Sequence, residues 1–153
     1  MTSAPLLLLV DDDPAVLASL QFSLELEGFR VGVFDSGETL MEQADLAHPS
    51  CLVLDYRLPG VDGLALLQVL RERGETCPAV IITSNPTRSI RQRASEAGAV
   101  LIEKPLLNDG LTVAIRTLIK ADGQSAVDVS RRRRRDRQTY YRRQQLYSEN
   151  GLE

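Results

Sequence analysis

The stretch Leu6-Leu7-Leu8-Leu9-Val10-Asp11-Asp12-Asp13-Pro14 joins a continuous apolar run to three consecutive carboxylates and a proline. A short apolar run without polar alternation predicts a strand that is covered on both faces, as in a parallel sheet. Asp13 followed by Pro14 predicts the start of a helix, with the aspartate as its cap and the proline in its first turn. The stretch therefore predicts one strand–helix unit of an α/β fold.

Four further units of this kind follow along the chain. Strands are predicted near residues 31–34, 52–54, 79–83 and 99–102. Helices are predicted from Pro14 until Gly28, after Gly37, from about Leu64 to Arg73, from Asn85-Pro86 until Gly98, and from about Asn108 to Lys120. The residues expected to face the core from the first two helices are Val16, Leu17, Leu20, Leu24, Leu26, Leu40, Met41 and Ala44. Five such units in about 120 residues predict a parallel sheet between helices, joined by right-handed crossovers.

Polar side chains gather where the predicted strands end. The first strand is followed by three aspartates, the third ends in Asp55, the fourth ends in Thr83 and Ser84, and the fifth is followed by Lys104. Ligands of such sheets bind outside the carboxyl ends of the strands. We therefore expect one pocket formed by Asp11, Asp12, Asp55, Thr83 and Lys104.

Several carboxylates in one pocket need a cation, a shared proton or a chemical use, because two of them about 4 Å apart repel by roughly 4 kcal/mol at an effective dielectric constant of 20. Oxygen ligands of this kind suit Mg²⁺. Acids, a hydroxyl and a lysine suit phosphoryl chemistry, in which a carboxylate can itself be the nucleophile. Serine or cysteine hydrolysis lacks its base, since the single histidine, His48, lies in a loop away from the strand ends.

Size and composition are those of one globular domain. The chain has 153 residues, of which 43% are apolar and 25% charged, as in ordinary folded domains. No apolar run approaches the roughly 18 residues of a membrane span, and the N-terminus lacks the pattern of a signal peptide. Cys51 and Cys77 lack the spacing of a metal site, so we expect reduced thiols and a cytoplasmic protein.

The charge is unevenly distributed along the chain. Residues 1–123 carry 17 acids and 10 bases, a net charge of −7, whereas residues 124–153 carry 4 acids and 8 bases, a net charge of +4. The boundary falls in the polar stretch Asp122–Ser125, which we expect to be flexible. The sequence thus predicts an acidic domain over residues 1–123 and a basic Arg/Tyr-rich tail over residues 124–153, flexible or partly helical.

The chain resembles the receiver domain of bacterial two-component response regulators in four segments: Val10–Pro14, Leu54–Gly63, Ile82–Ser84 and Glu103–Pro105. The segments span about residues 5–120, with 43 residues from Asp12 to Asp55, 28 from Asp55 to Thr83 and 21 from Thr83 to Lys104. The resemblance is closest to receivers of the nitrogen-fixation regulator type, which share the Ile-Glu-Lys-Pro ending. It implies a doubly wound five-stranded parallel sheet flanked by five helices, in the flavodoxin-like strand order 2-1-3-4-5.

The resemblance also implies a phosphoacceptor role. Asp55 would accept a phosphoryl group from a sensor histidine kinase or a histidine phosphotransfer protein, and the domain would then switch conformation to signal. Such a protein is not a multiple-turnover enzyme. Thr83 would bond a phosphoryl oxygen, and Lys104 would pair with Asp55 or its phosphate. The Lys104–Pro105 peptide bond would be cis.

A Mg²⁺ cofactor follows from the same resemblance. Asp12 would bind the ion directly and Asp11 chiefly through water, with Asp55 and the backbone carbonyl of Arg57 as the remaining protein ligands. Asp13 is expected to cap the first helix and not to bind metal. The Arg57 side chain either shields the phosphoryl group from water or is a solvated surface arginine, and these alternatives stay open.

One position departs from the family pattern. Receivers usually carry Tyr or Phe three residues before the lysine, as a rotamer switch coupled to the threonine, whereas this chain has Leu101. Leucine offers neither an aromatic ring nor a hydroxyl. The usual coupling therefore lacks its aromatic partner, and signalling is expected to depend on movement of the loop after Thr83.

The output of such a receiver leaves several alternatives. The family places the readout, and a possible homodimer interface, on the fourth helix, fifth strand and fifth helix. The tail, with Arg131–Arg135 and three nearby tyrosines, is a solvated linker, a nucleic-acid contact or a segment that docks on the receiver or a partner. Some 30 residues are too few for a helix-turn-helix effector, so we expect a stand-alone receiver or the front of a longer protein.

Three other functions could use residues of this kind. A phosphorelay intermediate would pass the phosphoryl group on to another histidine protein. A degenerate receiver would serve only as a binding module, but the complete set of acids, threonine and lysine disfavours this. An aspartate-nucleophile phosphatase of the haloacid-dehalogenase type expects a threonine where Ala15 stands, and it leaves Asp55 unexplained.

Overall fold

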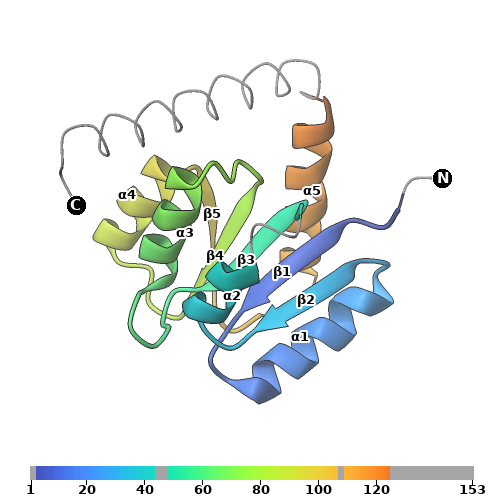
Figure 1. The fold of residues 1–153 in the computed structure, drawn as a ribbon, viewed down its shortest axis with the longest axis horizontal. Coiled ribbons are helices and arrows are strands. Elements are labelled where there is room, and N and C mark those ends of the chain that lie inside the picture. Colours follow the sequence, from blue (N-terminus) through green and yellow to red (C-terminus); the bar gives the residue numbers. More distant parts are fainter. Residues whose placement is uncertain (1–2, 44–47, 107–108, 125–153) are drawn as a thin grey trace.

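The computed structural model describes residues 3–43, 48–106 and 109–124. Strands and helices alternate through these residues, as the sequence predicts (Figure 1). Their order is β1 (Leu6–Val10), α1 (Pro14–Leu26), β2 (Arg30–Phe34), α2 (Gly37–Gln43), β3 (Cys51–Asp55), α3 (Gly63–Glu72), β4 (Ala79–Thr83), α4 (Arg88–Glu96), β5 (Ala99–Glu103) and α5 (Gly110–Gln124).

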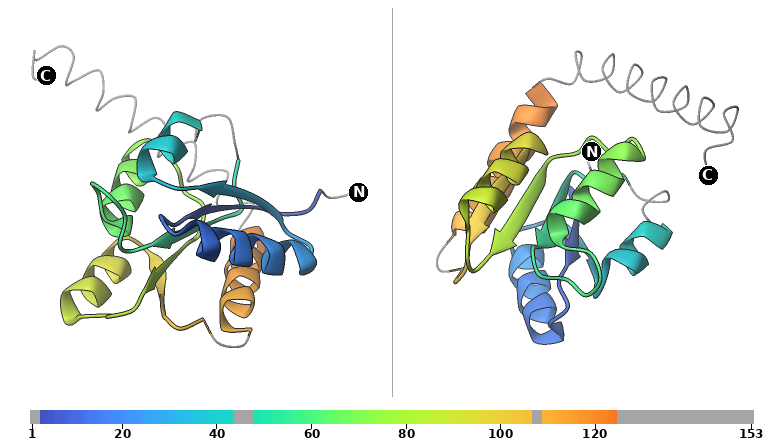
Figure 2. Two further views of the ribbon diagram at one scale, coloured as in Figure 1. Left: turned by 90° about the horizontal axis from the view of Figure 1, so that it is seen from below. Right: turned by 90° about the vertical axis from the view of Figure 1, so that its left-hand side faces the viewer.

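The five strands form one parallel sheet in the order β2-β1-β3-β4-β5, which confirms the predicted fold class. Apolar clusters cover both faces of the sheet. One cluster joins the strands to α2, α3 and α4 through residues such as Leu40, Leu67 and Ile90. The other joins them to α1 and α5, which lie together on the opposite face (Figure 2). Covering on both faces explains why β3 and β4 are buried along their whole length.

The first helix starts as predicted, but one residue that was predicted to face the core faces solvent. The Asp13 side chain accepts hydrogen bonds from the backbone N–H groups of Ala15 (2.9 Å) and Val16 (3.4 Å), which confirms it as the cap of α1. Leu17 and Leu24 are buried, but Leu26 is 73% exposed, so its predicted inward position is wrong. Two residues after Leu24 the helix has turned by about 200°, which places Leu26 on the opposite side.

Two helix ends differ from the sequence predictions. Helix α4 begins at Arg88 and not at Asn85-Pro86. The Thr87 N–H donates to the Asn85 carbonyl (2.9 Å), which closes a turn first, and the Thr87 hydroxyl then caps the helix at the N–H of Ile90 (3.2 Å). Helix α5 continues past Lys120 to Gln124 and thus includes residues 122–124, which were expected to be flexible. The predicted inward position of Ala44, the predicted start at Asn108 and residues 125–153 lie outside the described residues.

The Lys104–Pro105 peptide bond is cis, as predicted. Within the described part of the chain, no helix combines the length and the apolar character that a membrane span requires.

Candidate functional site

Three aspartates meet at the carboxyl edge of the sheet. One carboxylate oxygen of each of Asp11, Asp12 and Asp55 lies within 4.8 Å of the other two. Asp11 and Asp55 are buried, with 5% and 6% of their surface exposed, whereas Asp12 is exposed. The cluster is therefore buried on the side of Asp11 and Asp55 and open to solvent on the side of Asp12.

The register of two neighbouring strands brings these acids together. In the parallel pair β1 and β3, Val10 lies opposite Leu54. The next residue on each strand is an aspartate, so Asp11 and Asp55 leave the sheet side by side. The same apolar runs that drive both strands into the core thus hold two carboxylates at one buried edge.

A lysine from the far edge of the sheet completes the cluster. Lys104 follows β5, two strands away from β3, yet its Nζ lies 3.3 Å from Asp55 Oδ1 and 3.9 Å from Asp11 Oδ2. Its backbone N–H donates to the Thr83 carbonyl at 2.8 Å, which anchors the start of the side chain. One ammonium group therefore offsets part of the negative charge of two buried carboxylates.

The environment of Asp11 makes its charged form costly. Burial raises the pKa of the Asp11 carboxyl above its ordinary value, and the charges of Asp55 and Asp12 raise this pKa as well. The Asp13 N–H, which donates to Asp11 Oδ1 at 2.9 Å, and the Lys104 ammonium lower the pKa but do not cancel the increase. A second positive charge at this site would offset the remaining cost.

Asp11→Asn is expected to raise the midpoint of thermal unfolding at about pH 7 in EDTA, because the amide requires no charge to be desolvated. Since the pKa of Asp11 is raised in the folded state, the folded protein binds this proton more readily than the unfolded chain. The cost in the wild type is complete above the raised pKa and decreases as the pH falls toward the ordinary value of about 4. The advantage of the variant should therefore shrink over that range.

Unfolding midpoints of the wild type and Asp11→Asn at several pH values measure this effect. The control is Asp12→Asn, which removes an exposed carboxylate of the same cluster and should change the midpoint less. A variant that is less stable than the wild type at every pH would contradict the expectation.

The remaining predicted site residues lie at the same edge. Thr83 ends β4 and is buried (4% exposed), one residue beyond Ile82, which lies opposite Asp55. Its hydroxyl accepts a hydrogen bond from the Asn85 N–H at 3.3 Å. Arg57 follows Asp55 by two residues and is exposed. His48 is exposed, consistent with its exclusion from the site.

Sequence analysis missed a group of residues beside the site. Asp62 caps α3 by accepting from the Ala65 N–H (2.8 Å), and it also binds Arg93 of α4. An aspartate before a glycine and an apolar run is a capping signal, so the cap was detectable. Gly63 was missed too: a Cβ at this position would overlap the backbone carbonyl oxygen of Asp55.

The donor set fits a hard divalent cation. Three carboxylates at one edge, two of them buried and only partly neutralised by Lys104, are oxygen ligands of the kind that Mg²⁺ takes. No sulfur or imidazole ligand belongs to the described cluster, which disfavours Zn²⁺. The arrangement can hold such an ion and present the Asp55 oxygen beside it.

Comparison with known proteins points to one family. The family model described as response regulator receiver domain matches residues 7–116. The transcriptional regulatory protein FixJ of Bradyrhizobium diazoefficiens, a regulator of the nitrogen-fixation type, is 33% identical over 121 residues, which cover 78% of this chain and 59% of FixJ. The response regulator MprA of Mycobacterium leprae is 35% identical over 115 residues, covering 74% of this chain and 50% of MprA. The chain thus spans about half of these relatives.

Solved structures agree with this result. The response regulator StyR is 32% identical with a TM-score of 0.71, and the match covers 95% of this chain and 70% of StyR. A CheY-like receiver domain protein of Methanospirillum hungatei has a TM-score of 0.76 over 80% of this chain and 99% of that one. Its 23% identity supports the likeness of the fold alone.

Proposed function

Because this chain belongs to the receiver domain family of two-component response regulators, which signal by phosphorylation, we propose that Asp55 accepts the phosphoryl group. The observation that carries the proposal is the buried Asp55 carboxylate, held 3.3 Å from the Lys104 ammonium and beside Asp11 and Asp12. A buried carboxylate that strand register holds beside two other acids and a lysine supports a chemical role for Asp55 over a role in packing.

The proposed reaction is a phosphoryl transfer between two nucleophiles. A carboxylate oxygen of Asp55 forms a bond to phosphorus while the bond from phosphorus to the donor, an imidazole nitrogen of a phosphohistidine, breaks. The imidazole leaves with the electron pair, and Asp55 carries an acyl phosphate. Lys104 stabilises charge on the phosphoryl oxygens, and the Thr83 hydroxyl donates to one of them.

We also propose Mg²⁺ as the cofactor of this site. Asp11, Asp12, Asp55 and the backbone carbonyl of Arg57 would hold the ion. When bound, it supplies positive charge next to the carboxylates and the phosphoryl oxygens. The raised pKa of Asp11 supports this assignment, since burial first, and then the charges of Asp55 and Asp12, make the charged form of Asp11 costly, and Lys104 does not fully offset that cost.

Acetyl phosphate tests the proposal without knowledge of the kinase. Incubation with Mg²⁺ should label the chain with one phosphoryl group, detected by intact mass and traced to the peptide that contains Asp55. EDTA should prevent the labelling. Absence of labelling in Mg²⁺ would leave a binding module only, and repeated turnover of a simple phosphomonoester would indicate a phosphatase.

The partners and the location of the whole protein are part of the same proposal. The phosphoryl donor would be a sensor histidine kinase or a histidine phosphotransfer protein, and this protein would act in the cytoplasm. A homodimer would form through α4, β5 and α5. The protein acts as a phosphoacceptor and not as a multiple-turnover enzyme.

The tail is proposed as a unit separate from the receiver, with nucleic acid as one partner. If residues 125–153 bind nucleic-acid phosphates, their removal should weaken retention on DNA at low salt and abolish its dependence on salt. The full chain and the form that ends at Gln124 can be compared at two salt concentrations. Equal retention of the two forms would show that the tail does not bind nucleic acid.

Leu101→Tyr is expected to change the rate of labelling of Asp55 by no more than about twofold, the effect of a substitution that touches no site group. Leu101 lies in β5 opposite Ile81 and packs against the apolar cluster that includes Ile90 and Ala94 of α4. Labelling by acetyl phosphate over time measures the rate. Loss of labelling would show that this position contributes directly to the chemistry.

A further inference from the structure

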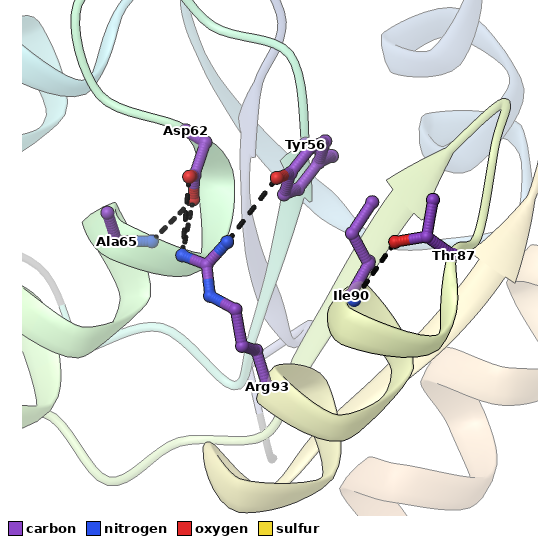
Figure 3. Close-up of polar contacts among 6 residues, drawn as sticks. All are labelled: Tyr56, Asp62, Ala65, Thr87, Ile90 and Arg93. Carbon is purple, nitrogen blue, oxygen red and sulfur yellow. Dashed lines mark hydrogen bonds and ion pairs between the residues drawn. The ribbon is translucent and has the colours of Figure 1, made fainter.

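One arginine of α4 contacts both ends of the loop that follows Asp55 (Figure 3). The Nη2 atom of Arg93 lies 3.1 Å from Oδ1 and 3.2 Å from Oδ2 of Asp62, and its Nη1 atom donates to the Tyr56 hydroxyl at 3.3 Å. Tyr56 is the residue directly after Asp55, and Asp62 is the cap of α3. A single guanidinium group therefore binds the first and the last residue of loop 56–62.

The two partners of Arg93 are themselves firmly held. The backbone N–H of Tyr56 donates to the Ile82 carbonyl (2.8 Å), and its carbonyl accepts from the Gly63 N–H (2.8 Å). Asp62 accepts from the N–H of Ala65 at 2.8 Å. Arg93 in turn lies within α4, whose start is set by the Thr87 cap (Figure 3). The contact thus joins two ordered elements through a planar group with fixed donor directions.

A solvent-exposed ion pair would be the ordinary explanation of such a contact. The Arg93 and Asp62 side chains are 38% and 32% exposed, so the pair contributes little to stability by charge alone. An exposed ion pair needs only the two charged groups, whereas the Arg93 guanidinium also donates to the phenol of Tyr56. This third contact joins α4 to the residue next to the phosphoacceptor.

We propose that Arg93 is a positioning residue that fixes loop 56–62 to α4, so that a change at Asp55 moves the loop and α4 together. The inference rests on the proposed phosphorylation of Asp55. It supplies a link that Leu101 does not, since a leucine offers no ring or hydroxyl to couple the site to the helix. By thermodynamic reciprocity, the position of α4 then also biases the geometry of the loop at the site.

Four variants of the full chain separate the contacts. Arg93→Gln removes the ion pair and the planar fork. Asp62→Asn removes the charge but preserves the cap of α3, since asparagine caps as well as aspartate. Tyr56→Phe removes only the hydroxyl. Arg91→Gln is the matched control, because Arg91 is an exposed arginine on the same helix.

Backbone amide chemical shifts, measured by NMR with and without Mg²⁺ and beryllofluoride, a phosphoryl mimic, test whether a change at Asp55 is coupled to α4. In the wild type and in Arg91→Gln, amides near Asp55 and amides of α4 should both shift. In Arg93→Gln the shifts near Asp55 should persist while those of α4 fall by about half or more, with smaller losses in Asp62→Asn and Tyr56→Phe. If Arg93 served only to stabilise the fold, its loss would not reduce the shifts of α4 while leaving those near Asp55 unchanged.

Two outcomes overturn different claims. If the amides near Asp55 do not shift in the wild type, the proposed function fails and this inference fails with it. If they shift in Arg93→Gln and α4 responds as fully as in the wild type, the site functions but Arg93 does not couple it to α4.

Discussion

Asp55→Asn is expected to abolish labelling by acetyl phosphate completely while the domain remains folded. The amide has the size of the carboxylate but no anionic oxygen that can attack phosphorus. Lys104 loses its partner at 3.3 Å, but the Asp11 carboxylate at 3.9 Å remains. Removal of one of several like charges at a buried edge also lowers the repulsion on Asp11.

Intact mass after incubation with Mg²⁺ and acetyl phosphate measures the labelling, and thermal unfolding measures the fold. Asp13→Asn is the matched control: it is the same substitution at a residue whose function is to cap α1, and asparagine caps equally well. This control should be labelled like the wild type. A label retained in Asp55→Asn would mean that another residue is the phosphoacceptor.

Gly63→Ala is expected to destabilise the domain by about 2–3 kcal/mol, the cost of adding a methyl group where no space is available for it. The substitution is also expected to impair labelling of Asp55. A Cβ at Gly63 would overlap the carbonyl oxygen of Asp55 and lie 3.2 Å from Cα of Tyr56. These are backbone atoms, which cannot rotate away as a flexible side chain can. The backbone of the phosphoacceptor must therefore shift, and its carboxylate shifts with it.

Denaturant unfolding gives the loss of stability, and the acetyl phosphate assay gives the loss of labelling. Gly123→Ala is the control, because the same methyl group in α5 would meet no atom within 4 Å. That variant should be at least as stable as the wild type, since alanine favours a helix over glycine. Normal stability and labelling of Gly63→Ala would show that the backbone of Asp55 adapts without cost.

The sequence alone predicts most of the fold, because local patterns carry the information. Apolar runs of five residues identified β1 and β4 with the bounds that the structure shows. The Asp13 cap followed from a two-residue signal. Local patterns predicted the start of α4 and the end of α5 less well. A hydrogen-bonded turn from Asn85 to Thr87 delays the start of α4, and α5 continues through Gly123 although polar residues and glycine there predict a flexible stretch.

The three acids of the site were also predictable from the sequence. Each stands at the end of an apolar run, and in a parallel sheet the ends of neighbouring strands share one edge. The pairing of Val10 with Leu54 then places Asp11 beside Asp55. The resemblance of the motifs added the roles of these residues, whereas their proximity follows from the strand pattern.

Only the tertiary structure decides which side chains surround those acids. Arg93 lies 31 positions from Asp62 and 37 positions from Tyr56 along the chain, and no periodicity connects them. The need for glycine at position 63 arises because the chain passes close to the backbone of Asp55. Strand and helix signals depend on neighbours in sequence, whereas these contacts depend on how packed elements approach one another, which is determined when the sheet and its helices form one core.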